Sequence, residues 1–344
     1  MSLSEVANPK AAAKLIQDFR KRYATKVCMA PGTDHDRRIV SAHTLSVESM
    51  LRKISIDGHV YAIGSSKKIA RDVFPIEIQR MGLRDVSVFN GFCAMHDRDL
   101  FACLETEPFR FSPEQLFKLA YRTASKESYL KRKQVESLLL PEQYAEIHGI
   151  KEEVHLSEAA FIYQAGVVRG AEEIENLKQV LDGFLLTKQW SRLVTRAVLF
   201  PHTPSVLGTT TFQPYVDLDG RQIQDFEDLD ADMSHIFMSV IPVETGGAAI
   251  FSWLDTANSA PREFYESITR GTSLTSAVIH ALLDHAENVA FSHSWYEQLN
   301  NKLKEYIFSR VIKFDNGIDQ IDAYRADDAA PNLGDWGKPI VTSF

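Results

Sequence analysis

Two short Cys/His pairs constrain how this chain can fold, because both must reach the same point in space if they bind one metal ion. The first pair is Cys28 and His35, and the second is Cys93 and His96, far along the chain in the stretch FNGFCAMHDRDLF. Two ligands do not complete a structural zinc site, which is nearly always four-coordinate. The sequence therefore predicts a Cys2His2 zinc site that joins these two distant segments.

The residue types favour zinc over other metals. Thiolate and imidazole in equal number suit the tetrahedral shell of Zn²⁺, which does not require oxygen ligands. Cys93 stands where a helix is expected to begin, and the helix dipole stabilises a thiolate there. An isolated Cys-x-x-His pair is more often two unrelated residues, with the cysteine packed as a small hydrophobic side chain. The spacing of the upstream pair is wide, so His43 is an alternative to His35 as the fourth ligand.

The composition is that of an ordinary globular protein. Of the 344 residues 44% are hydrophobic and 24% are charged, which suffices for real cores and suggests two domains more readily than one. No window is apolar enough to span a bilayer, and the N-terminus lacks the apolar core of a signal peptide. The three cysteines are too few for a disulfide framework. We therefore expect a cytoplasmic protein with no membrane contact.

Charge divides the chain into two unlike halves. Residues 1–150 hold 23 Lys and Arg against 18 Asp and Glu, a net charge of +5. The remainder holds 38 − 23 = 15 against 46 − 18 = 28, a net charge of −13. The basic half indicates nucleic acid as a partner, and the acidic half indicates a protein partner. The alternative is that both are ordinary solvated surfaces.

The secondary-structure pattern changes near residue 190. Ser112 and Pro113 predict the start of a helix, and helical spacing returns from about residue 157 to 186. Beyond 190, short β-rich segments separated by Pro, Gly and Asp predict an antiparallel sheet with a hairpin at Thr245-Gly246-Gly247, followed by two helices. We expect an α+β fold in three parts: a treble-clef zinc-binding module with helices (1–110), a helical connector (111–190) and an α+β domain with an antiparallel sheet (191–344).

The first of these helices and the segment after it are rich in basic side chains. They face either phosphate groups or solvent, and the second arrangement is the commoner one for lysine- and arginine-rich helices. The residues concerned are Arg122, Lys126, Lys131, Arg132 and Lys133.

One part of the chain is similar to a known nuclease family. His43 ends the apolar run RRIVSAH and is followed along the chain by Asn90 and then by His96. This order resembles the HNH, or ββα-metal, nucleases. The stretches SAHTL, DGHVY and FCAMHDRDLF also resemble a group of bacterial proteins with a Cys…Cys…Ser-His and Phe-Cys-x-x-His-Asp pattern. In that pattern the second cysteine falls near His35, which favours His35 as a zinc ligand. The resemblance covers roughly residues 27–102.

The resemblance implies a catalytic site. In HNH nucleases a strand-borne histidine activates water, an asparagine fixes that histidine, and a helix-borne histidine binds the catalytic metal. Here the first two roles would fall to His43 and Asn90. If His96 binds structural zinc, Asp97, with Asp34 or Asp36, would hold Mg²⁺ or another divalent cation. The chain departs from the pattern at Ala42, where the family usually has Asp, Glu or His, and the helix has no second histidine after His96. His43 equally suits a structural role, hydrogen-bonded to backbone.

Two functions follow from these patterns. The first is a zinc-binding, HNH-like protein acting on nucleic acid, as a nuclease in bacterial defence. The second is a non-catalytic, zinc-stabilised protein whose C-terminal domain binds a protein partner. The basic first half favours the nuclease, whereas Ala42 favours the second function. The sequence contains no P-loop, nucleophile elbow, zincin motif or dinucleotide fingerprint.

Overall fold

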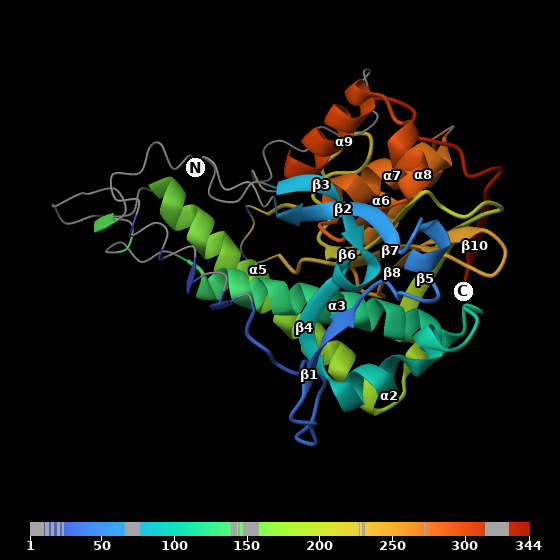
Figure 1. Cartoon of the computed structure of the whole chain (residues 1–344). Helices are drawn as coiled ribbons and strands as arrows, with labels where there is room; N and C mark the ends of the chain where they lie inside the picture. Colours follow the sequence, from blue (N-terminus) through green and yellow to red (C-terminus); the bar gives the residue numbers. More distant parts are fainter. Residues whose placement is uncertain are drawn as a thin grey trace.

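The computed structural model describes residues 24–65, 76–138, 158–313 apart from residues 227, 229, 230 and 272, and 330–344, together with a few isolated positions elsewhere. Within these residues the fold combines helices with an antiparallel sheet, so the α+β prediction is confirmed. Figure 1 shows the sheet lying between two groups of helices.

The main sheet contains eight of the described strands, in the order β10-β5-β8-β7-β6-β9-β2-β3, and neighbouring strands are antiparallel. The predicted hairpin joins β7 to β8, where Pro242 pairs with Gly247. The strand bounds are β2 His59–Ser65, β3 Ile76–Gly82, β5 Leu193–Phe200, β6 Val206–Phe212, β7 Ile236–Pro242, β8 Gly247–Leu254, β9 Val289–Phe291 and β10 Ile340–Ser343.

Helices cover both faces of this sheet. On one face α3 (Pro113–Glu136) packs across β6 and β7, and α5 (Glu158–Leu186) packs against α3. Ser112 caps α3 as predicted, because its side chain accepts a hydrogen bond from the backbone N–H of Gln115. The other face carries α6 Ala260–Thr269, α7 Leu274–His285, α8 His293–Gln298 and α9 Asn301–Lys313. Short 3-10 helices are η2 Leu51–Ile54, η3 Leu83–Asp85 and η4 Trp190–Arg192.

Each face of the sheet has its own hydrophobic core. Ala197 belongs to the core that contains side chains of α3 and α5, whereas its neighbour Val198 belongs to the core that contains side chains of α6 and α7. This alternation follows from the two-residue repeat of a strand. β6 and β7 are buried along their whole length, as expected for strands covered on both sides.

The sheet and one core cross the boundaries expected at residues 110 and 190. β2 pairs with β9, so that Tyr61 lies opposite Phe291, and one edge of the sheet therefore comes from the expected first module. The core beneath α3 joins Leu45, Phe117 and Ile250, one residue from each expected part. The sheet and this core are therefore continuous across residue 110. Independent folding of the three parts stays a prediction.

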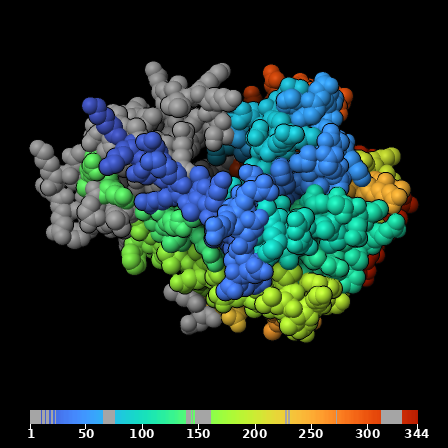
Figure 2. Space-filling model, turned by 60° about the horizontal axis from the view of Figure 1, so that its bottom comes forward, coloured from blue at the N-terminus to red at the C-terminus, as the bar shows by residue number. Residues whose placement is uncertain are grey.

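A smaller unit sits beside the main sheet. β1 (Ile39–His43) and β4 (Val88–Cys93) form an antiparallel pair, and α2 (Ala94–Glu105) continues directly from β4. Gly91 is required in β4, because a Cβ atom there would lie 2.1 Å from the ring of Phe89. Figure 2 shows described residues from the first part of the chain (blue) next to those of α2 (teal) and α5 (yellow-green) on one face of the molecule.

Candidate metal centre

The structure brings the four predicted metal ligands together. The ligand atoms of Cys28, His35, Cys93 and His96 all lie within 4.8 Å of one another. Nδ1 of His96 lies 3.4 Å from Sγ of Cys28, 3.3 Å from Sγ of Cys93 and 3.3 Å from Nδ1 of His35. A tetrahedral zinc site, with Zn–N near 2.0 Å and Zn–S near 2.3 Å, places its ligand atoms about 3.3–3.8 Å apart. The group is close enough to hold a metal ion and is compatible with zinc.

Backbone hydrogen bonds fix the first ligand segment against β4. The N–H of Val27 donates to the carbonyl of Asn90 at 3.1 Å, and the N–H of Met29 donates to that of Gly91 at 2.8 Å. The N–H of Cys93 also donates to Sγ of Cys28 at 3.3 Å. Burial raises the pKa of the Cys28 thiol, and this backbone hydrogen bond acts in the opposite direction by favouring the thiolate that a metal needs.

The two histidines are prepared to bind through Nδ1. Nε2 of His35 lies 2.9 Å from the carbonyl oxygen of Gly32, so Nε2 carries the proton and Nδ1 is free. Burial lowers the pKa of His96, and the neighbouring His35 lowers it further, which keeps the imidazole neutral as a ligand must be. His43, the alternative fourth ligand, is not part of the described metal-binding group.

His43 lies at the end of β1, where it pairs with Val88 of β4. Its Nε2 atom is buried and has no hydrogen-bond partner among the described residues. Burial lowers the pKa of His43, Glu105 and Asp97 raise it, and Arg122 lowers it. The imidazole is therefore neutral near pH 7 and lies in a mixed environment of two acidic groups and one basic group.

These four side chains form what we call the His43 cluster: His43, Asp97, Glu105 and Arg122. Arg122, 2% exposed, makes an ion pair of 2.7 Å with Glu105 and lies over the ring of Phe101 at 4.2 Å. Burial raises the pKa of Asp97, and Arg122 opposes this shift. Oδ1 of Asp97 and Nε of Arg122 are also buried without a partner in the described part of the chain.

The sequence patterns did not indicate Glu105 or Arg122 as members of the His43 cluster. They placed Arg122 on a solvated or phosphate-facing surface, and the structure corrects this, because Arg122 faces the protein interior. Lys133 of the same helix is also buried, at 4% exposed, and makes an ion pair with Glu136. Helical spacing was the signal available in the sequence. Leu119 lies three residues before Arg122 and Tyr129 lies seven after it, so all three share one face of the helix, and that face is buried.

Asn90 is placed differently from its expected role. Its side chain forms a hydrogen bond with Tyr129 of α3, and its backbone carbonyl accepts from Val27. The described interactions of His43 involve Asp97, Glu105, Arg122 and the backbone of Arg84, but not Asn90. The structure thus brings His43 and Asp97 into one cluster and leaves Asn90 outside it.

The residues near His43 fit a catalytic divalent cation poorly. Such a cation would need Asp97 or Glu105 as ligands, since Ala42 occupies the preceding position and is fully buried. Arg122 already supplies a positive charge at Glu105, and its guanidinium repels a second cation. We therefore assign no role to Mg²⁺ at this cluster.

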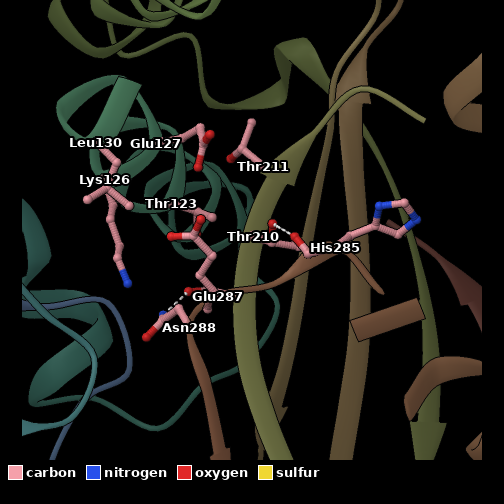
Figure 3. Close-up of a pocket in the computed structure, with 10 residues that line it drawn as sticks. Thr123, Lys126, Glu127, Leu130, Thr210, Thr211, His285, Glu287 and Asn288 are labelled. Carbon is pink, nitrogen blue, oxygen red and sulfur yellow. Dashed lines mark hydrogen bonds between the residues drawn. The ribbon is translucent and has the colours of Figure 1, made fainter. Parts of the chain in front are cut away.

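A polar pocket separate from the His43 cluster lies between α3 and β6 (Figure 3). Lys126 and Glu127 of α3 line it, and burial lowers the pKa of Lys126 to about 8 and raises the pKa of Glu127 to about 7. The ring of His285 points away from this pocket, to the other face of the sheet, where it stacks on Phe212 at 4.0 Å. The enclosed space is about 20 Å³, enough for one water molecule.

None of the described helices has the length and apolarity that crossing a bilayer requires. Comparison of the chain with models of protein families, with curated proteins and with solved structures gave no match.

Proposed function

We propose that this protein is a zinc-binding, HNH-like protein that acts on nucleic acid. The observation that carries the proposal is the convergence of two thiols and two imidazoles within 4.8 Å of one another, with Nδ1 of His96 at 3.3–3.4 Å from each of the other three ligand atoms. Zinc prefers such a ligand set. Zinc at this position is structural: it ties the segment from Cys28 to His35 onto the junction of β4 and α2. A closed four-ligand shell leaves no position for substrate.

The action on nucleic acid is supported by the His43 cluster. Nε2 of neutral His43 and Oδ1 of Asp97 are both hydrogen-bond acceptors without a partner among the described residues, so each can accept a hydrogen bond from water. His43 would remove a proton from this water as its oxygen attacks phosphorus; the P–O bond to the leaving sugar oxygen would break, and that oxygen would take up a proton from solvent. The guanidinium of Arg122 would offset the negative charge that develops. A role in bacterial defence rests on the resemblance alone.

The test is cleavage of DNA and RNA by the purified protein and by two variants. His43→Ala should lower the rate by on the order of 10²- to 10⁴-fold, because a general base is removed. His202→Ala is the matched control, since His202 is exposed and lies in the loop between β5 and β6. Zinc content should be unchanged in both variants. Equal rates for the two variants would exclude His43 as the base.

A second candidate function is a non-catalytic, zinc-stabilised protein that binds a protein partner through its acidic C-terminal half. The burial of His43 Nε2 favours it, because a general base must reach its substrate. On this alternative the wild-type protein cleaves no nucleic acid, and zinc removal still unfolds the N-terminal unit.

A further inference from the structure

An open groove beside the metal centre is lined by three basic side chains. Lys26, Arg37 and Arg38 line it together with Asp36 and Ile39. The three basic side chains are exposed and make no salt bridge within the described residues. The carboxylate of Asp36 is already engaged, because its Oδ1 accepts a hydrogen bond of 3.0 Å from the backbone N–H of Arg38. The groove therefore carries three positive side chains against one negative side chain, which makes it a net positive surface.

The metal ligands hold both sides of this groove in place. Lys26 lies two residues before Cys28, and Arg37 lies two residues after His35. The backbone carbonyl of Arg38 also accepts a hydrogen bond of 2.8 Å from Ala94, the first residue of α2. A metal bound to this group would thus fix the relative positions of all three cations.

The lining of the groove indicates which nucleic acid it suits. Proteins that bind single strands without sequence preference usually offer aromatic side chains on which bases stack. Among the described residues that line the groove none is aromatic, so this lining offers charge to phosphates but no surface for bases. Charge alone suits the regular phosphate backbone of a duplex and carries no sequence information.

We propose that Lys26, Arg37 and Arg38 form a phosphate-backbone contact for double-stranded nucleic acid, and that the bound metal positions this contact. The inference rests on the proposed function, since it assigns the surface by which the protein holds its substrate. Binding is then independent of the nucleotide sequence and is lost when the metal is removed.

The experiment is fluorescence anisotropy with a short labelled duplex, measured between about 50 and 200 mM salt, the range over which phosphate contacts weaken strongly. Changing all three residues to glutamine should weaken binding and lower the slope of log K against log salt by about 3, roughly 1 for each contact. The matched control is Arg262→Gln, Lys302→Gln and Lys338→Gln, which removes the same charge from exposed positions elsewhere. The control should keep the wild-type slope.

Two further measurements complete the test. Arg37→Gln alone, in the exposed loop, should lower the slope by about 1 and retain the metal. Removal of the metal from the wild type should reduce the slope as much as the triple change does. Equal slopes for the triple variant and its control would overturn the inference, and so would undiminished binding after metal removal. Cleavage by the triple variant at the wild-type rate would overturn it while leaving the proposed function intact.

Discussion

The ammonium group of Lys178 donates a hydrogen bond of 2.8 Å to the backbone carbonyl of Met29, the residue that follows Cys28 of the candidate metal centre. Lys178 is 2% exposed and also donates to the hydroxyl of Tyr121 at 2.9 Å and to the carboxylate of Asp182. One buried cation on α5 thus holds the backbone of the first ligand segment.

Lys178→Met should destabilise the protein by about 2–4 kcal/mol, because it removes the donor to the Met29 carbonyl and the Tyr121 hydroxyl and leaves the partly buried carboxylate of Asp182 without its cation. It should also weaken zinc binding, since Met29 is no longer held. Urea denaturation and zinc competition with a chelator measure the two effects. Lys302→Met, at an exposed position, is the control. Unchanged zinc affinity in Lys178→Met would show that α5 does not support the site.

Purified protein should carry one zinc ion per chain, and Cys93→Ser should abolish this binding. Structural zinc contributes directly to folding free energy, so the variant should also lose stability. Cys103→Ala is the control, because Cys103 lies on α2 outside the ligand group. Elemental analysis and thermal denaturation give the readouts. Zinc retained at full occupancy in Cys93→Ser would remove Cys93 from the site.

Cleavage by His43 should persist into mildly acidic solution. Burial lowers the pKa of His43 below the ordinary histidine value of about 6.5, so most of the imidazole is still neutral at a pH of about 6.5. The acid limb of the rate profile should therefore have its midpoint below about pH 6.5. A midpoint at or above that value would mean that another group acts as the base.

His285 should make the protein sensitive to acid. Burial lowers its pKa to about 3, whereas an unfolded histidine titrates near about 6.5. The unfolded state therefore takes up the proton first, and stability falls as pH drops below about 6.5, by about 2 kcal/mol at pH 5. His285→Leu should reduce the loss of stability between about pH 7.5 and 5 by this amount, and His202→Gln should not. Urea denaturation at the two pH values tests this, and parallel curves for wild type and His285→Leu would contradict it.

Local patterns in the sequence predicted the four residues that the structure brings together as a candidate metal centre, and several element boundaries. Cys93 and His96 are one turn apart at a helix start, so their proximity follows from helix geometry. The Ser112 cap and the turn between β7 and β8 likewise depend on residues within a few positions of each other. The meeting of the two ligand pairs was inferred from metal chemistry, which supplies a long-range constraint that periodicity lacks.

The buried charges could not be predicted in this way. Lys178 binds a backbone carbonyl 149 residues away, and every residue type offers the same carbonyl. Arg122 is buried because Glu105 and Phe101 lie on another helix that packs against α3. The pairing of β2 with β9 could not be predicted from the sequence either, because no residue pattern in these strands specifies which strand pairs with which.

The pairing of β2 with β9 sets an order of events during synthesis. Tyr61 is made early, and its partner Phe291 follows 230 residues later (291 − 61). At about 5–20 residues per second, a ribosome takes roughly 12 to 46 seconds to cover that distance. During this interval the hydrogen-bonding edge of β2 that will meet β9 is open to other chains. The β2–β3 pair and the candidate metal centre lie wholly within residues 28–96, so their contacts can form before β9 is made.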